Sequence, residues 1–451
     1  MARRVVVIGA GLAGLTVADI LIAAGCDVVV LEAADRVGGR AFTRADGFVE
    51  AQYAEAGAEW IDTVHVRAHA LIDRLGLRVD PNATTWTAVR RWLYRSGRLL
   101  GPDQLSEIEP TLADDLERFE SALADVAAGI TDPSRPQAHP RAVEHDSMSI
   151  AGLVERLGLR QLARLFVTRN MQGEFAAEPS EVSVLFVAQQ RAVYHHAGAQ
   201  HGTIEAQRLL GGISGLTDGL AAMVPAGTVR TGQRVVAIDG WDHPSGDGPV
   251  VVRTTTDSFE ADAVVASCTL IALRNVAISP ALPPSIHSAI TSLGYGTVTK
   301  TALQYESRAW PSGYATTEGD AQRVYEPTAA APGKAGILMA YTGGDGGRRL
   351  GTMDETDRIA EIERSQREMY PDLPARLAGF SRAWSADPLF GGSYAVYRPG
   401  EVTRFWDAVR QPYGRLHIAG EHAATWTGYL EGAIESGETV AARVLASASV
   451  D

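Results

Sequence analysis

The sequence predicts an α/β protein that begins with a β-α-β unit, and three observations support this fold class. Residues 5–8 and 27–31 are short apolar runs of the kind found in strands that are buried on both faces. Between them, residues 12–24 carry apolar side chains at helical spacing. A glycine-rich turn joins the first run to the helix, and Glu32 follows the second run. This order is typical of a dinucleotide-binding unit.

The glycine-rich turn has the pattern Gly9-x-Gly11-x-x-Gly14. We expect Gly9 to permit the tight turn, Gly11 to let the backbone approach a pyrophosphate, and Gly14 to let the helix pack closely. N–H groups at the helix start would hold the phosphates. Glu32 would accept hydrogen bonds from ribose hydroxyls, and it disfavours a 2′-phosphate and therefore NADP. The alternative is an incidental glycine-rich turn, which the surrounding strands, helix and acid disfavour.

A second glycine pair follows the second strand, in the run Arg36-Val-Gly38-Gly39-Arg40. Its last arginine would stand beside the pyrophosphate that the first turn holds, which favours FAD over NAD. The segment resembles the extended dinucleotide signature of FAD-dependent flavoproteins of the amine oxidase family. That family includes monoamine oxidases, polyamine oxidases, L-amino-acid oxidases and histone lysine demethylases.

The resemblance extends patchily over the whole chain. Residues 384–394, 415–422 and 426–437 follow the monoamine oxidase pattern almost position by position, with further landmarks at 179–186, 211–216 and 297–300. It implies a Rossmann-type FAD-binding domain of the GR2-like flavoproteins with a discontinuous α+β substrate-binding domain. The implied FAD-binding domain comprises residues 1–76, 205–285 and 385–451, and the substrate-binding domain comprises residues 77–204 and 286–384.

For the cofactor, the resemblance implies further contacts from Gly57, Val235, Trp384, Glu421 and Leu430. Val235 matches the position whose backbone holds the adenine. The helix expected over 428–445 would direct its positive end at the flavin ring. Ser393 stands where monoamine oxidases carry the cysteine that bonds to the flavin. We therefore expect non-covalent FAD.

The resemblance assigns the chemistry to Lys300, Tyr394 and Tyr429. Lys300 matches the lysine that holds a water beside flavin N5 and assists reoxidation by O₂, because a fixed positive charge stabilises developing superoxide. The alternative is a lysine that reaches from a strand to the surface. Tyr394 and Tyr429 match the two aromatic residues that flank the substrate amine. The alternative for them is a pair of core aromatics with satisfied hydroxyls.

Substrate identity is indicated less directly. Trp60 stands near the place where L-amino-acid oxidases put a carboxylate-binding arginine, which disfavours an amino acid substrate. Glu59 and Asp62 could supply an ammonium site, as acidic residues do in this stretch of polyamine oxidases. Glu59 could equally bond only to backbone or flavin. Glu205 is a second candidate amine anchor.

Neighbouring polar residues give weaker indications. His195, His196 and His201 lack a carboxylate partner at ligand spacing, so we expect no metal site there and place them on the cavity wall or the surface. Arg169 and Asn170, at positions where monoamine oxidases are apolar, indicate a polar or larger substrate.

The composition limits the classes of molecule that this protein is expected to bind and the compartment in which it is expected to work. The 451 residues carry 54 acidic and 41 basic side chains, a net charge of −13, which argues against nucleic acid or an anionic membrane and suits a cationic small molecule. Cys26 and Cys268 cannot form a disulfide framework, so we expect a reducing compartment. No run reaches the ~20 apolar residues of a membrane span. We expect a soluble cytoplasmic protein, and a homodimer is left open.

The expected reaction is hydride transfer from the amine α-carbon to flavin N5. The product is an imine that hydrolyses to an aldehyde or ketone plus ammonia or amine, with O₂ reduced to hydrogen peroxide. One alternative is a biosynthetic flavoenzyme that oxidises an unusual C–N bond or acts without net O₂ turnover. A flavoprotein acting on another protein is disfavoured, because its inserted arm would need a longer chain.

Outside the motifs, the sequence predicts helices over 105–127 and 356–369, a mobile surface loop over 132–146, and a strand over 297–305.

Overall fold

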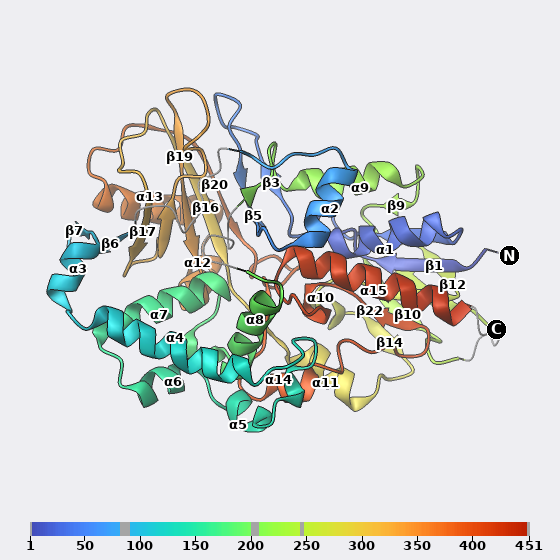
Figure 1. The fold of residues 1–451 in the computed structure, drawn as a ribbon. Coiled ribbons are helices and arrows are strands. Elements are labelled where there is room, and N and C mark those ends of the chain that lie inside the picture. Colours follow the sequence, from blue (N-terminus) through green and yellow to red (C-terminus); the bar gives the residue numbers. More distant parts are fainter. Residues whose placement is uncertain (1, 82–90, 200–206, 244–247, 449–451) are drawn as a thin grey trace.

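The computed structural model describes residues 2–81, 91–199, 207–243 and 248–448. The described residues form three larger sheets and three two-stranded ones. Figure 1 shows helices packed against the sheets and the two ends of the chain close together at one end of the molecule. The predicted β-α-β unit is confirmed, with strand β1 over Arg4–Ile8, helix α1 over Leu12–Ala23 and strand β2 over Asp27–Leu31.

The N-terminal unit belongs to a parallel five-stranded sheet with the order β22-β13-β1-β2-β9. Its remaining strands are β9 (Val229–Arg230), β13 (Ala263–Ala266) and β22 (Leu416–Ile418). Every residue of β13 and β22 is buried, which is the burial expected of a parallel sheet covered on both faces. Segments from the beginning, the middle and the end of the chain therefore form one sheet.

Helix α1 packs against helix α15 (Leu430–Ala448) and helix α9 (Ser214–Met223), as Figure 1 shows. A Cβ atom added at Gly437 of α15 would lie 2.8 Å from the carbonyl oxygen of Ala13. The absence of a side chain at Gly437 therefore lets the two helices approach closely. This contact places the middle of α15 against the start of α1.

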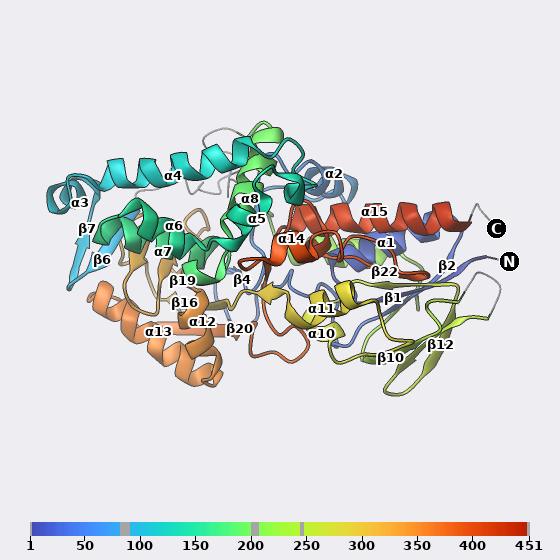
Figure 2. The same ribbon diagram turned by 90° about the horizontal axis from the view of Figure 1, so that it is seen from below.

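A second sheet of four strands lies at the same end of the molecule and has the order β12-β11-β10-β14 (Figure 2). Its strands are β10 (Val235–Asp239), β11 (Val250–Thr254), β12 (Ser258–Ala261) and β14 (Ala277–Ser279). Strand β12 ends at Ala261, and the next strand, β13 of the first sheet, starts at Ala263, so that the chain passes from one sheet to the other at Asp262.

The third sheet has seven strands in the order β20-β16-β19-β18-β17-β6-β7. These are β6 (Arg91–Arg95), β7 (Arg98–Leu100), β16 (Thr299–Tyr305), β17 (Tyr314–Thr317), β18 (Arg323–Tyr325), β19 (Gly336–Thr342) and β20 (Arg376–Ala383). Helix α13 (Glu355–Met369) covers one face, and helix α7 (Gln161–Glu174) packs on β19 (Figure 2). All seven residues of β16 are buried, so a polar side chain on it must find partners inside.

A layer of helices lies beside this sheet. It comprises α3 (Pro102–Ile108), α4 (Leu112–Ala128), α5 (Ala142–Ser147), α6 (Ile150–Leu157), α7 and α8 (Val184–His196). Two of our predictions are corrected here. The helix expected over 105–127 is broken before Pro110, because the residue before a proline disfavours helical geometry. The surface loop expected over 132–146 includes part of α5, and Asp146 is fully buried, accepting hydrogen bonds from Ser183 and Thr403.

The remaining elements are short and connect these layers. They include β3 (Thr43–Arg44), β4 (Ala54–Glu55), β5 (Trp60–Ile61), α2 (Val66–Arg74), β8 (Gln207–Arg208), α10 (Leu270–Leu273), α11 (Pro284–Ser292), β15 (Gly294–Tyr295), α12 (Gly344–Gly351), β21 (Ala395–Val396) and α14 (Glu401–Phe405). Strand β5 pairs with β8, which aligns Trp60 with Arg208.

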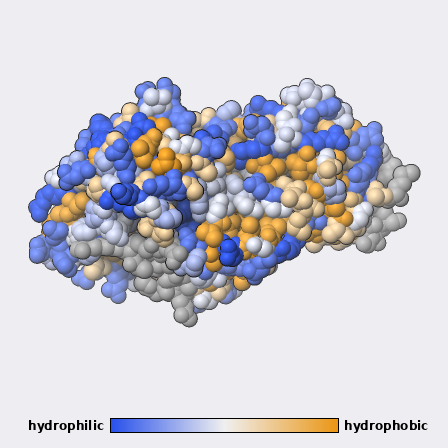
Figure 3. Space-filling view, turned by 90° about the horizontal axis from the view of Figure 1, so that it is seen from above, coloured by the Kyte–Doolittle hydropathy of each residue, from blue (hydrophilic) through white to orange (hydrophobic). Residues whose placement is uncertain are grey.

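On the face shown in Figure 3, apolar residues form several groups separated by polar ones. The large apolar side chains that are exposed, such as Val66, Ile108 and Val143, come from different elements. Scattered exposed apolar residues of this kind are ordinary for a folded protein. Among the described residues, no helix combines the length and the apolar character that crossing a membrane requires.

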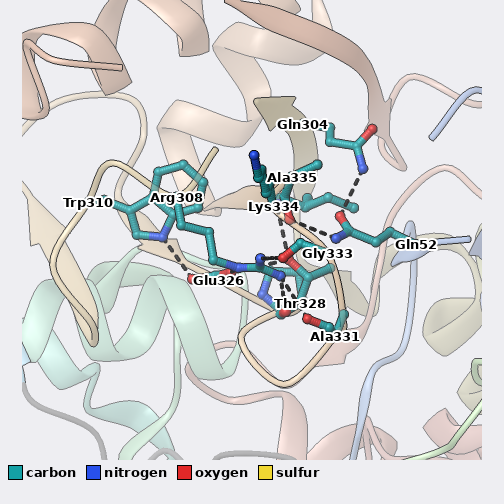
Figure 4. A network of polar contacts seen from close by, with 12 residues as sticks. Gln52, Gln304, Arg308, Trp310, Glu326, Thr328, Ala331, Gly333, Lys334 and Ala335 are labelled. Atoms are coloured by element: carbon teal, nitrogen blue, oxygen red, sulfur yellow. Dashed lines mark hydrogen bonds and ion pairs between the residues drawn. The ribbon is translucent and has the colours of Figure 1, made fainter. Parts of the chain in front are cut away.

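Arg308 organises the connection between β18 and β19 (Figure 4). Its guanidinium donates to the carbonyl oxygens of Gly333 (2.8 Å), Thr328 (2.8 Å) and Ala331 (3.1 Å), and it pairs with Glu326 at 2.6 Å. One side chain therefore ties three backbone carbonyl groups of the connection together, and that of Thr328 also accepts from within the connection, from the N–H of Ala331 at 2.9 Å.

Replacing Arg308 by Met should lower the free energy of unfolding by about 2 kcal/mol, because three carbonyl groups and a carboxylate lose their charged donor. Denaturant unfolding followed by circular dichroism measures this. The matched control is Arg118→Met, because half of the Arg118 side chain is exposed and its partner Asp115 also accepts from the backbone of Arg160. A loss in R308M no larger than that in R118M would contradict the prediction.

Candidate functional site

A continuous cavity of about 830 Å³ runs from the five-stranded sheet to the seven-stranded sheet. It is lined by the first glycine-rich turn, by β16 and β18 of the seven-stranded sheet, and by helices α7, α8 and α15. Of the residues that the sequence assigns to cofactor binding or to the chemistry, Glu205 lies outside the described residues, and all of the others except Gly14 line this cavity. The fold thus gathers side chains from distant parts of the chain around one space.

The glycine turn forms one end of the cavity. Gly9 has a φ of +103°, which favours glycine, and its N–H donates to Leu31 at 2.8 Å. A Cβ atom added at Gly11 would meet no atom within 4 Å, because it would project into open space beside the start of α1. The first N–H groups of that helix have no acceptor within the helix. The end of the cavity is therefore a preformed cradle for an anionic group.

Gly14 and Gly57 serve close packing around this cradle. A Cβ atom at Gly14 would lie 2.1 Å from the carbonyl oxygen of Gly9, and one at Gly57 would lie 1.9 Å from the carbonyl oxygen of Arg40. Both distances are too short for any side chain. Gly14 thus allows α1 to pack closely on the glycine turn, as its place in the motif predicts. Gly57 allows the backbone around it to pack against Arg40, next to the second glycine pair.

Glu32 lies at the end of β2 and is 7% exposed. Its carboxylate accepts hydrogen bonds from the backbone N–H groups of Ala10 at 2.7 Å and Ala34 at 2.8 Å. Burial raises the pKa of Glu32, and these two hydrogen bonds oppose the rise. Because each carboxylate oxygen can accept more than one hydrogen bond, Glu32 retains capacity for a ribose hydroxyl at the cavity wall.

Arg40 follows Gly39, whose φ is +57°, and forms an ion pair with Glu421 at 2.9 Å. Its buried Nη1 has no acceptor in hydrogen-bond geometry among the described residues. Glu421 also accepts from the N–H groups of Ala395 at 3.2 Å and Gly428 at 2.9 Å. Glu421 therefore ties the second glycine pair to the segment that precedes α15, where Leu430 lines the cavity.

Two further predicted cofactor residues stand at different places on the wall. Trp384 is 1% exposed, donates from Nε1 to the carbonyl oxygen of Ala56 at 2.7 Å, and meets Phe390 edge to face. Val235 begins β10 at the opposite side of the glycine turn. Both side chains are fixed by packing, so they form rigid surfaces of the cavity.

Lys300 lies on β16 and is 3% exposed, so the alternative of a lysine at the surface is wrong. Its Nζ donates to Glu59 at 2.6 Å and to the carbonyl oxygen of Gly57 at 3.1 Å. The hydroxyl of Tyr325 donates to the same carboxylate oxygen of Glu59 at 2.5 Å. Lys300 is thus a buried cation held by the segment of residues 57–59, and Tyr325 on β18 in turn holds the carboxylate of Glu59.

The other oxygen of Glu59 lies 3.1 Å from Nε of Arg208, which is 6% exposed. Burial by itself would raise the pKa of Glu59, but the charges of Lys300 and Arg208 outweigh burial and lower it. Glu59 is therefore an ionised carboxylate between two cations. A substrate ammonium would have to compete with both of them, and the assignment of Glu59 as an ammonium anchor stays a prediction.

Tyr394 and Tyr429 both line the cavity. The hydroxyl of Tyr394 donates to the carbonyl oxygen of Gly173 at 3.1 Å and lies 3.1 Å from the hydroxyl of Tyr341. The ring of Tyr429 packs edge to face against Trp426 and His65. The two rings come from different segments and are each held by their surroundings.

Asp62 has a buried network behind Tyr429. It accepts a short hydrogen bond from the hydroxyl of Tyr194, and Nε2 of His65 lies 3.5 Å from its carboxylate. Burial lowers the pKa of His65 to about 3, so this histidine is neutral at ordinary pH. Asp62 and Tyr194 both line the cavity. Sequence reasoning missed Tyr194 and His65 as members of this site.

The helical wall of the cavity carries a further polar group that sequence reasoning missed. It consists of Glu120 on α4, Glu174 at the end of α7, and Gln190 and Arg191 on α8. Arg191 lies 3.3 Å from Glu120, and Oε1 of Gln190 is buried with no donor among the described residues. The sequence signal for Gln190 and Arg191 was their place as polar residues in the middle of the otherwise apolar helix α8.

Several predicted residues stand elsewhere. Glu205 and His201 lie outside the described residues. His195 and His196 are exposed at the end of α8. Arg169 donates to the backbone carbonyl groups of Thr317 and Glu318, whereas Asn170 lines the cavity and accepts from Arg323 at 3.2 Å. Within the described ranges, no group of three metal-ligating side chains occurs.

The donors around the cavity fit FAD. The cradle at Gly11, the guanidinium of Arg40 and the start of α1 suit a pyrophosphate, and Glu32 suits a ribose. From this end the cavity continues past Trp384 to Lys300 and the two tyrosines. It can therefore accept a long cofactor with its phosphates at the glycine turn.

Comparisons with known proteins agree with this geometry. The family model of flavin containing amine oxidoreductases matches residues 12–445. Amine oxidase B of Sus scrofa is 27% identical over 98% of this chain and 86% of its own length, and human amine oxidase B is 26% identical over the same shares.

Two solved structures share the fold. Cyclohexylamine oxidase from Brevibacterium oxydans IH-35A has a TM-score of 0.86 at 22% identity and full coverage of both chains. Putrescine oxidase, solved with bound putrescine, has a TM-score of 0.86 at 23% identity over 99% of both chains. The predicted fold class is confirmed. The chain belongs to the family of flavin containing amine oxidoreductases, and it is an FAD-dependent oxidoreductase that acts on amines.

Proposed function

We propose that this protein oxidises a small amine with non-covalent FAD and transfers the electrons to O₂. The observation that carries the proposal is the single cavity that joins the phosphate cradle at Gly11 to Lys300, Tyr394 and Tyr429. Ser393, which lines this cavity, cannot form a thioether with the flavin. We also propose the domain division given above and, from the two free cysteines, a cytoplasmic location.

The overall chemistry converts R–CH₂–NH₂, O₂ and water into an aldehyde, ammonia and hydrogen peroxide. Bound FAD would accept two electrons from the amine and pass them to O₂. Gly9, Gly11, Glu32, Arg40 and Glu421 would hold the cofactor, together with the other predicted contacts.

The chain's own residues then set the substrate's position. The ring faces of Tyr394 and Tyr429 would orient the amine and restrict water around it, and they attract a cation equally. Lys300 keeps a fixed positive charge on the wall, which favours negative charge that develops nearby. Asp62, buried behind Tyr429, would accept a hydrogen bond from a polar amine. These groups together orient the substrate and exclude water.

The test is the absorption spectrum of the purified protein before and after acid precipitation, followed by anaerobic mixing with mono-, di- and polyamines. A yellow supernatant and bleaching of the flavin by one amine class would support non-covalent FAD and amine oxidation. Peroxide formed on admission of air would support O₂ as the acceptor. A yellow protein that no amine bleaches would contradict the proposed substrate class, and yellow colour that stays with the precipitate would contradict non-covalent binding.

A further inference from the structure

Lys300 and Glu59 by themselves form a neutral pair. Their charged atoms lie 2.6 Å apart, and both side chains are less than 5% exposed. A neutral buried pair produces only a weak field at the cavity, since its two charges nearly cancel at longer distance. If nothing else stood nearby, Glu59 would remove the effect of the fixed charge on Lys300.

Arg208 changes this balance. Its Nε lies 3.1 Å from the oxygen of Glu59 that Lys300 does not contact, and Nη1 donates to the carbonyl oxygen of Pro327. The guanidinium also lies 5.9 Å from the ring centre of Tyr53 and 5.8 Å from that of Trp60. Arg208 is thus fixed by backbone and aromatic rings, and it adds a second cation to the pair.

A second acid, Glu55, interacts electrostatically with Arg208. Glu55 is 2% exposed and accepts from the N–H of Ile213 at 2.9 Å and from the hydroxyl of Thr43 at 2.8 Å. Burial raises the pKa of Glu55 to about 7, with Arg208 lowering it and Glu59 raising it further. Tyr53 is the other titratable group that interacts with Glu55, and burial raises its pKa.

We name Lys300, Glu59, Arg208 and Glu55 the Lys300 cluster. With Glu55 protonated, the two cations and one carboxylate leave one positive charge, and with Glu55 ionised the cluster is neutral. Without Arg208 the corresponding charges are zero and minus one. The sign of the field at this wall therefore depends on Arg208.

We propose that Arg208 is a positioning residue that occupies one side of Glu59, so that the Lys300 wall of the cavity stays one unit of charge more positive than Lys300 and its acids alone would make it. This inference rests on the proposed function, in which electrons enter and leave a flavin bound in the same cavity. A positive wall favours negative charge on the ring, because a preformed charge in a buried site needs no solvent reorganisation. Arg208 touches neither substrate nor cofactor in this role and acts through Glu59 and Lys300.

The experiment measures the dissociation constant of sulfite for the FAD-loaded enzyme, followed by loss of flavin absorbance, in the native protein, R208M and R208K. Sulfite is an anion whose binding reports positive charge near the flavin and requires no turnover. R208M should bind sulfite about tenfold more weakly, which is the effect of one unit charge in a partly buried environment. R208K keeps the charge and should stay within about threefold of the native value.

Two further variants separate charge from structural damage. E59Q removes the negative charge and should bind sulfite more tightly than the native enzyme, in the direction opposite to R208M. R308M loosens the connection that carries Pro327 but leaves the Lys300 cluster charged, and it should bind sulfite as the native enzyme does. Structural damage alone would weaken sulfite binding in R208M, E59Q and R308M alike.

The pH dependence of the sulfite dissociation constant gives an independent test of the cluster's charge. As the pH rises through about 7, Glu55 ionises and the native cluster loses its net charge. E55Q cannot ionise there, so the ratio of native to E55Q dissociation constants should rise from about one to about tenfold. Taking the ratio at each pH cancels the ionisation of sulfite itself.

The inference is overturned if R208M binds sulfite as the native enzyme does, or if R208M and E59Q change the affinity in the same direction. A flat ratio between the native enzyme and E55Q would overturn the part assigned to Glu55. Failure of the proposed function is a separate result, because it would show as a yellow native enzyme that no amine bleaches while the sulfite constants still differ among the variants.

Discussion

Replacing Gly11 by Val should give a folded protein that binds FAD about 100-fold more weakly and is purified almost colourless. A Cβ atom at this position meets nothing within 4 Å, so the valine side chain fits the protein and fills the cradle. Displacing the pyrophosphate from the helix start would cost two or three charge-assisted hydrogen bonds, about 3 kcal/mol in total. Flavin content, the dissociation constant of added FAD and the circular dichroism spectrum measure the two effects separately.

The matched control for this variant is Gly14→Val. A Cβ atom at Gly14 would clash with the carbonyl oxygen of Gly9, so this change should lower both the stability and the flavin content. The stability of the two variants thereby distinguishes Gly11, which faces the cradle, from Gly14, which packs against the turn. A yellow Gly11→Val protein with an FAD affinity within threefold of the native value would contradict the proposed phosphate site.

Replacing Lys300 by Met should slow reoxidation of the reduced enzyme by O₂ about 100-fold, because the positive charge nearest to the reaction is removed. Glu59 keeps Arg208 and Tyr325 as partners, so no buried carboxylate is left unpaired. Stopped-flow mixing of anaerobically reduced enzyme with O₂ measures this rate. Reduction of the flavin by the amine should change much less, since Tyr394 and Tyr429 are untouched.

The chain offers an unusually clean control for this change, because it contains only two lysines. The second one, Lys334, is exposed on the connection shown in Figure 4. Lys334→Met removes the same charge from the protein at a distance from the cavity and should leave the O₂ rate unchanged. An equal loss in both variants, or no loss in Lys300→Met, would contradict the role proposed for Lys300.

Short-range signals in the sequence determined the N-terminal unit and its chemistry. The two valine-rich runs, the spaced glycines and Glu32 lie within 32 residues of one another, so propensity and turn geometry alone place them correctly. The broken helix at Pro110 was equally local and could have been predicted, since a proline is a direct signal. The buried Asp146 had no such signal, because its hydrogen-bond partners lie 37 and 257 residues away.

The sequence by itself also determined, through the motifs near both ends of the chain, many of the residues that line the cavity. Only the tertiary structure decided what those residues touch. Lys300 is paired with Glu59, 241 positions away, and Glu59 is paired with Arg208 on another strand. Ion pairs of this kind depend on strand register and on the burial of both partners, and neither is encoded in the spacing of nearby residues. The charge at the candidate active site is therefore a property of the folded chain.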